Sequence, residues 1–333
     1  MRIAFKDLEL GTGVDVWIAN MLKALRGQGV ECSSTLYPAR YQFAPSLLKL
    51  RGRFTDDEDI LHSNIAYGYA FRGESPLVVT EHLVVHDPSY VKYKTFAQKM
   101  YHKSVYRGEV KSLKAASAVT CVSHYTRTML KQSFGHSDAH VIYNGLDTEY
   151  FCPGFVSKDI YEINPEKFVL LFTGNLTRRK GADLLPGIMK ALGDDYVLLT
   201  TSGLRKSTKH TYGNIRSVGT VSREELVRLY NVCDALLFPS RLEGFGLSVV
   251  EAMACGKPVV ATDCSSLPEL VVDGRGGFLC RIDDVKDFAN KVDIVRSDES
   301  LRRSMGAFNR KRAEEKFSLG LMAKEYIKLY QSL

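Results

Sequence analysis

Short apolar segments alternate along the chain with stretches of helical periodicity. In the first half, segments typical of buried strands lie at 2–5, 30–37, 59–63, 76–82, 118–123 and 140–144, with helical patterns at 14–26 and 124–134. In the second half, strand segments lie at 168–174, 196–202, 215–219, 234–240, 257–262 and 277–280, with helical patterns at 181–193, 223–232, 248–255 and 284–297. Such alternation predicts a parallel sheet with helices on both faces. Because it occurs twice, the fold class is α/β with two doubly wound, Rossmann-like domains.

The periodicity breaks at 152–166, a stretch that contains two prolines and a glycine and is typical of a linker. We therefore expect an N-terminal domain over 1–157 and a second domain over 158–312. Residues 313–333 have the pattern of an amphipathic helix that remains after the second sheet is complete. Ligands of doubly wound sheets bind beyond the carboxyl ends of the strands, so we expect the site in a cleft between the domains.

Composition excludes several classes of protein. No apolar run approaches the ~18–20 residues of a membrane span, and the N-terminus has no signal pattern, so we expect a cytoplasmic protein. The seven cysteines are scattered without a C-x-x-C pair, which favours small buried side chains over a disulfide framework or a metal site. The net charge of +7 is spread over both halves, which does not indicate a nucleic-acid-binding domain.

A glycine-rich turn is flanked by two carboxylates in the stretch EGFGLSVVE. Gly244 and Gly246 follow Glu243 at the end of a strand segment, and Ser248 is suited to cap the helix that comes next. Free backbone N–H groups and the helix dipole at such a position favour a phosphate. Ser248 and Glu251 also match the S-x-x-E capping box, which gives Glu251 a purely structural alternative.

A second candidate site is the basic loop in LFTGNLTRRKG. Arg178, Arg179 and Lys180 lie between the end of a buried strand and the next helical pattern. Three adjacent cations repel one another, and a bound diphosphate would offset this repulsion through arginine forks and the lysine charge. The alternative is a solvated basic turn, as most charged runs are.

The run PSRLEGFGLSVVEAMACGKPVVAT resembles the signature of glycosyltransferase family 4, the retaining sugar-nucleotide enzymes of GT-B fold. Glu243 and Glu251 meet the Glu-x7-Glu spacing of that family. Further similarity lies in FTGNLTRRKGADLL, VGTVSREELVRLYNVCDALLFPS, VIYNGLDTEYF and the TEH at 80–82. The resemblance therefore covers most of the chain in order and spacing.

The resemblance implies roles for the two carboxylates and the basic pair. Glu243 would lie against the donor sugar, and Glu251 would hold the ribose hydroxyls. Arg179 and Lys180 would stabilise the leaving diphosphate in place of a divalent metal. Backbone amides facing the sugar and phosphates would come from Gly244, Phe245, Gly246 and Leu247.

The resemblance also implies contacts outside these two loops. Gly219 to Val221 would border the base, and His82 would lie near the transferred sugar. Gly11 and Gly13 match the loop of the first domain that closes over the donor. Residues 313–333 match the final helix of the family, which crosses back onto the first domain.

Two features depart from the family pattern. Asn175 stands where the family often has an arginine, so that contact would be absent or supplied by Arg178. His86 lies close to His82, and a histidine at a strand end can equally be a structural residue.

The function that the resemblance implies is transfer of a hexosyl unit from a UDP- or GDP-linked sugar to a sugar or lipid-linked glycan, with retention and without metal or cofactor. The alternative is a GT-B epimerase or a sugar-nucleotide-binding protein without transferase activity. A nicotinamide reductase is disfavoured because Val16 occupies the third glycine position of the dinucleotide fingerprint. A metal-dependent transferase would need the acidic run at 56–59, but that run precedes a strand.

The segment 90–114 has seven Lys or Arg, five aromatics and a single acid, Glu109. It could contact an anionic membrane and bring the protein to a lipid-linked acceptor. The alternative is an ordinary helix with a solvated basic face.

Overall fold

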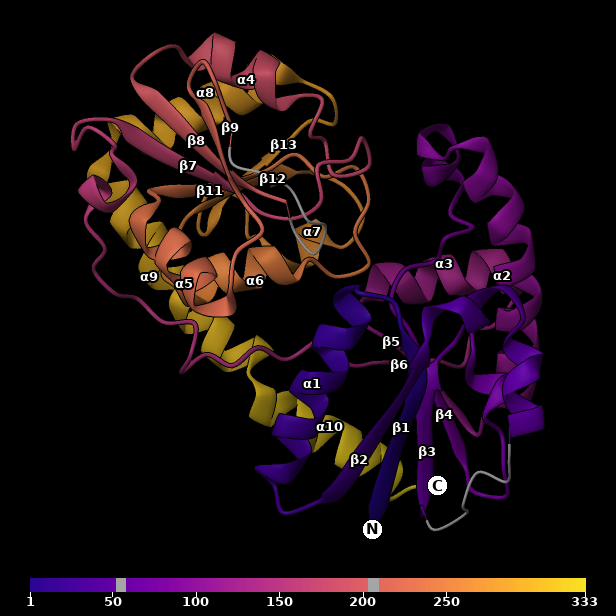
Figure 1. Cartoon of the computed structure of the whole chain (residues 1–333). Coiled ribbons are helices and arrows are strands. Elements are labelled where there is room, and N and C mark those ends of the chain that lie inside the picture. Colours follow the sequence, from indigo (N-terminus) through magenta and orange to yellow (C-terminus); the bar gives the residue numbers. More distant parts are fainter. Residues whose placement is uncertain (52–57, 203–209) are drawn as a thin grey trace. The chain divides into compact units, whose positions relative to one another are not determined.

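The computed structural model describes residues 1–51, 58–202 and 210–333, which form two units (Figure 1). Unit 1 comprises residues 1–145 and 319–333, and unit 2 comprises residues 146–318. The sequence placed the domain boundary at 157, and the units divide at 145. Within the described ranges, no helix is both long and apolar enough to cross a membrane.

Unit 1 is built on a six-stranded sheet of order β2-β1-β3-β4-β5-β6, in which all paired strands are parallel. The strands are β1 (Arg2–Glu9), β2 (Glu31–Pro38), β3 (Ile60–Asn64), β4 (Leu77–Glu81), β5 (Ala118–Cys121) and β6 (His140–Val141). Each falls on a predicted segment, so the prediction is confirmed. The chain moves outward from β1 to β2 and then from β3 to β6, so β1 and β3 form a topological switch point.

Helices cover both faces of this sheet. One face carries α1 (Gly13–Arg26) and α10 (Leu319–Tyr330), whose apolar side chains share one core with β1. The other face carries α2 (Phe96–Ala115) and α3 (His124–Phe134), with a separate core. Shorter 3-10 segments are η1 (Ala39–Phe43), η2 (Pro45–Arg51), η3 (Gly68–Ala70) and η4 (Pro88–Tyr93).

Unit 2 contains a seven-stranded sheet of order β13-β12-β11-β7-β8-β10-β9. The strands are β7 (Phe168–Phe172), β8 (Tyr196–Thr201), β9 (His210–Tyr212), β10 (Ile215–Gly219), β11 (Ala235–Phe238), β12 (Val259–Thr262) and β13 (Gly277–Cys280). Six of them were predicted. The edge strand β9 was missed and pairs antiparallel with β10. The switch point of this sheet lies between β7 and β11, which are parallel neighbours.

The helical elements of unit 2 are η5 (Lys158–Tyr161), α4 (Leu185–Leu192), α5 (Arg223–Val232), α6 (Leu247–Ala254), α7 (Leu267–Leu270), α8 (Val285–Ser297) and α9 (Glu299–Phe317). Helix α4 begins four residues later than predicted, because Gly181 is left-handed and Pro186 lies in the first turn. Helix α9 was not predicted as such. Ser222 caps α5, with the Glu225 N–H donating to its Oγ at 3.1 Å.

The ends of unit 2 lie against each other. Leu146 forms a parallel bridge with Ser318, and its N–H donates to the carbonyl oxygen of Phe317 at 2.7 Å. Arg310 of α9 donates to the carbonyl oxygens of Thr148 and Phe151. These contacts attach residues 146–157 to unit 2, which explains why the units divide before the proline-containing stretch.

Candidate active site

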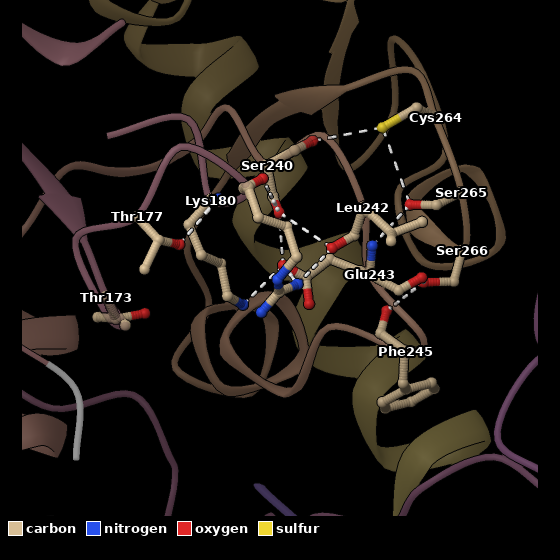
Figure 2. A network of polar contacts seen from close by, with 12 residues as sticks. Thr173, Thr177, Lys180, Ser240, Leu242, Glu243, Phe245, Cys264, Ser265 and Ser266 are labelled. Carbon is tan, nitrogen blue, oxygen red and sulfur yellow. Dashed lines mark hydrogen bonds and ion pairs between the residues drawn. The ribbon is translucent and has the colours of Figure 1, made fainter. Parts of the chain in front are cut away.

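Two loops of unit 2 meet beyond the carboxyl ends of β7 and β11, at the switch point of the sheet where doubly wound folds bind ligands. Lys180 from the loop after β7 points toward Glu243 from the loop after β11, with Nζ 2.6 Å from Oε1 (Figure 2). Nη1 of Arg179 lies 3.7 Å from the same oxygen. The structure therefore brings together the basic pair and the first carboxylate that the sequence singled out.

Glu243 is only 6% exposed, and its neighbours keep it ionised. Burial raises the pKa of Glu243, but the charges of Lys180 and Arg179 outweigh it and hold the pKa below its usual value. Ser240 Oγ donates to Oε1 at 2.5 Å, and the Glu243 N–H donates to Ser265 Oγ at 3.0 Å. The group is therefore a fixed anion and not a proton donor at neutral pH.

The Lys180 side chain, which is 15% exposed, lies beside this anion, with its ammonium 5.0 Å from the centre of the Phe238 ring. Burial lowers the pKa of Lys180, and the nearby Glu243 carboxylate opposes that shift. An ammonium has three donors, so a lysine that holds Glu243 can also donate to an incoming anion. In a site with little water this charge acts more strongly than it would at the surface.

The backbone of the basic loop is pressed against the second loop at Gly181. Its φ is +73°, and a Cβ there would lie 2.0 Å from the carbonyl oxygen of Pro239. The Arg241 N–H donates to the carbonyl oxygen of Arg179 at 2.8 Å. Only glycine fits this close approach, and it sets where Arg179 and Lys180 lie.

Arg241 is a residue of this site that the sequence analysis missed. Its guanidinium is 5% exposed and forms a bidentate pair with Asp183 (2.6 and 3.0 Å) and a bond from Nε to Asp283 (2.5 Å). Burial lowers the pKa of Arg241, but the two carboxylates outweigh it and raise the pKa. The only available signal was an arginine at a strand end, with no indication of its distant partners. Arg241 ties the two loops to the segment before α8.

The remaining polar side chains of the basic loop have different environments. Arg178 is 74% exposed and its Nε lies 3.9 Å from Asp183, so the solvated alternative describes this cation. Asn175 has an enclosed Oδ1 that lacks a hydrogen-bond partner among the described residues. Oδ1 of Asn175 is therefore an unused hydrogen-bond acceptor in the same loop as Arg179 and Lys180.

The glycine-rich turn enters α6 differently from the prediction. The helix begins at Leu247, its N-cap is Gly246 with a φ of +112°, and no side chain caps it. The proposed cap at Ser248 and its capping box are therefore wrong, because the left-handed Gly246 caps the helix two residues earlier. Ser266 Oγ holds the turn instead, donating to the carbonyl oxygen of Phe245 at 2.7 Å. Gly244, Gly246 and Phe245 are all buried in this turn.

Glu251 projects from α6 toward the aromatic side chain of Tyr230. The Tyr230 hydroxyl lies 2.7 Å from Oε2 of Glu251 and 3.2 Å from Thr173 Oγ1, which links α6 to α5 and β7. Burial raises the pKa of Glu251, with the Tyr230 hydrogen bond acting in the opposite direction. Instead of the expected capping contact, Glu251 therefore accepts a hydrogen bond from Tyr230 of α5.

Gly219 ends β10 with a φ of +77°, and Val221 lines a nearby groove of about 770 Å³. Tyr161 and Arg216 line the same groove. The contact of this region with a base stays a prediction.

The predicted residues of unit 1 follow β1 and β4. Gly11 is left-handed, and Thr12 caps α1 at Gly13. His82 packs edge-on against Trp17, with ring centres 4.7 Å apart, and burial lowers its pKa to about 3. His82 as a whole is partly exposed, but its Nε2 atom is enclosed and has no hydrogen-bond partner within the described ranges.

Two alternatives from the sequence can also be placed. His86 Nε2 lies 2.8 Å from Glu109 of α2, a contact that accounts for this histidine structurally. In the acidic run, Asp56 and Asp57 fall outside the described residues, and Asp59 accepts from Arg2 N–H at 2.7 Å.

Comparison with known proteins agrees with this architecture. The family model described as glycosyl transferases group 1 matches residues 156–312, and the model described as glycosyltransferase family 4 matches residues 30–150. An uncharacterised glycosyltransferase of Methanocaldococcus jannaschii is 32% identical over 220 residues, which is 65% of this chain and 59% of that protein. The chain thus spans less than two thirds of the length of this relative.

Solved structures share the fold over its whole length. Sucrose-phosphate synthase of Thermosynechococcus elongatus has a TM-score of 0.85 at 19% identity, covering 100% of this chain and 98% of that one. HepE of Anabaena, solved with UDP-glucose, has a TM-score of 0.78 at 20% identity, with both chains fully covered.

Two doubly wound units and these matches define the GT-B fold class of glycosyltransferases, which confirms the predicted fold. Within that class, residues 156–312 match the family described as glycosyl transferases group 1, and residues 30–150 match glycosyltransferase family 4.

Proposed function

We propose that this protein transfers a hexosyl unit from a UDP- or GDP-linked sugar to a hydroxyl of a saccharide or lipid-linked glycan. The observation that carries the proposal is the contact of Lys180 and Arg179 with Glu243 at the switch point of unit 2. Two partly buried cations beside a fixed carboxylate suit a ligand that is anionic at one end and acquires positive charge at the other, as a sugar diphosphate does when it ionises. The UDP-glucose bound to HepE supports this choice of donor class.

In the proposed reaction the bond between the anomeric carbon and the diphosphate breaks, and the acceptor oxygen bonds to the same face of that carbon. The acceptor proton passes to the departing phosphate oxygen, so a protein base is unnecessary. Arg179 and Lys180 would neutralise the charge that forms on the diphosphate, in the role that a divalent metal has elsewhere. Glu243, ionised at neutral pH, would stabilise positive charge at the sugar.

Hydrolysis of a panel of sugar nucleotides tests this proposal without an acceptor. We expect UDP or GDP release that persists in EDTA, with the sugar released in its original anomeric configuration by NMR before mutarotation. Loss of activity in EDTA would contradict metal independence, and an inverted sugar would contradict retention. A donor that is epimerised but never cleaved would support the alternative activity.

Thermal unfolding with UDP, GDP, ADP and NAD provides a second test, since a ligand of the folded state raises its stability. Stabilisation by NAD alone would contradict the proposed transferase function.

A further inference from the structure

Helix α2 of unit 1 has an exposed face that carries only one sign of charge. Between residues 88 and 117 the exposed cations are Lys92, Lys99, Lys103, Arg107, Lys111 and Lys114. The single acid of this stretch, Glu109, is 2% exposed and contacts His86. Residues 88–117 therefore expose six cations and no carboxylate.

Two large apolar side chains lie on the same face at the N-terminal end of α2. Phe96 is 80% exposed and Met100 is 52% exposed, and these positions are followed at helical spacing by Lys103 and Arg107. The opposite face is pressed against the unit at Gly108, where a Cβ would lie 2.6 Å from the carbonyl oxygen of Ala66. That packing keeps the apolar and cationic side chains turned outward.

Further apolar side chains flank the start of α2. Val91 of η4 is 46% exposed, and Phe43 of η1 is 72% exposed with its ring 6.0 Å from the ring of Tyr101. Figure 1 shows α2 along one side of unit 1, on the face of the sheet away from α1 and α10. Large exposed apolar groups that gather next to cations indicate an interaction surface.

We propose that this face of unit 1, the α2 face, docks on an anionic lipid bilayer. The cations would contact lipid phosphates, and Phe96 and Met100 would enter the boundary between headgroups and acyl chains. A nucleic acid would satisfy the cations, but its backbone offers no apolar layer for Met100 and Val91. The charge and the apolar groups together therefore favour a membrane over another polyanion.

This inference rests on unit 1 alone and does not depend on the proposed function. If both hold, the docked protein would meet a glycan carried by a lipid.

Co-sedimentation with vesicles tests the α2 face. We expect the full chain to bind vesicles of phosphatidylcholine with about a third phosphatidylglycerol at low salt, and to bind pure phosphatidylcholine far more weakly. The double variant K103Q/R107Q should reduce binding roughly 30-fold, because each cation near an anionic surface contributes about fivefold. A matched control, K190Q/K286Q, removes two exposed lysines of unit 2 and should bind as the wild type does.

The variant F96S/M100S separates a bilayer from other polyanions. We expect it to lose vesicle binding while its binding to heparin stays unchanged. Equal binding to neutral and anionic vesicles, or wild-type binding by K103Q/R107Q, would overturn the proposal. So would heparin binding without vesicle binding.

UDP-dependent thermal stabilisation should be the same in all three double variants. Vesicle binding without any response to sugar nucleotides would refute the proposed function but still support membrane docking by the α2 face.

Discussion

Nζ of Lys180 and Oε1 of Glu243 lie 2.6 Å apart, although their residues belong to different loops of unit 2. Each loop follows one of the two strands at the switch point, so the parallel topology brings them together. Both side chains are largely removed from water, and the pair has Arg179 and Ser240 as further partners. This contact is where the predicted function can be tested most directly.

Replacing the carboxylate should separate catalysis from binding. For Glu243→Gln we expect turnover to fall by about 10²–10³-fold, since a fixed charge at the reacting centre is lost. UDP or GDP binding should persist, because Arg179 and Lys180 remain. Steady-state donor hydrolysis and calorimetric titration with the nucleotide measure the two effects. An unchanged rate would contradict the role of Glu243.

The same pair should show coupling in stability. Lys180→Met leaves Glu243 buried without its main counter-charge, and we expect a loss of about 3–5 kcal/mol. The double variant with Glu243→Leu should be less destabilised than the sum of the single variants. Urea unfolding of the three variants gives the coupling energy, and additivity within error would mean that the contact contributes nothing.

Gly181→Ala should displace the basic loop. Its Cβ would meet Pro239 O at 2.0 Å, so we expect a loss of more than about 3 kcal/mol and weaker nucleotide binding. Gly135→Ala is the matched control, since Gly135 is also left-handed (φ +70°) but a Cβ there meets nothing within 4 Å. It should cost only about 1 kcal/mol, measured by denaturant unfolding. Equal losses would show that the close approach is unimportant.

Tyr230→Phe should weaken the nucleotide site by releasing Glu251. We expect UDP affinity to fall by roughly 3–10-fold, in line with the loss of one hydrogen bond to a carboxylate. Tyr196→Phe loses a comparable bond to Asp293 on the outer part of unit 2 and should leave affinity unchanged. Titration calorimetry of both variants decides the comparison. A Tyr230 variant with wild-type affinity would argue against nucleotide binding by Glu251.

His82 should make unit 1 less stable in acid. Because burial lowers its pKa to about 3, the unfolded chain takes up the proton first, near pH 6.5. Stability should therefore fall as the pH drops from about 6.5 toward 3, by up to about 1.4 kcal/mol per pH unit. The difference between wild type and His82→Asn isolates this contribution, with Trp17 fluorescence as the signal. A pH-independent difference would contradict the lowered pKa.

Asp7 should give the stability of unit 1 a pH dependence of the opposite sign. Burial raises its pKa to about 7, so the folded state holds the proton and stability should fall as the pH rises from about 4 to 7. Asp7→Asn should remove this contribution, so the stability of the wild type relative to the variant, measured by urea unfolding, should decrease as the pH rises from about 4 to 7. A pH-independent difference between the two proteins would contradict the raised pKa.

The elements that the sequence predicted are those with a strong local pattern. Twelve strands and the helices α1, α3, α5, α6 and α8 were found because apolar periodicity and helix boundaries are local signals. Strand β9 has three residues and α9 is rich in charge, so neither has such a pattern.

The site was predictable in its residue types but not in its contacts. Motif similarity pointed to Arg179, Lys180 and Glu243, but it gave no means of telling that the neighbouring Arg178 is exposed. Arg241 with Asp183 and Asp283, and Tyr230 with Glu251, join residues far apart in the chain. Such pairs arise from tertiary packing, and no single-sequence pattern records them.

The bridge between Leu146 and Ser318 closes a continuous segment whose two ends adjoin. We therefore expect residues 146–318 to fold as a separate fragment that contains the proposed nucleotide site, and a short linker from Gly145 to Leu319 would yield the complementary fragment with its last helix intact. Nucleotide affinity and vesicle affinity could then be assigned to separate polypeptides.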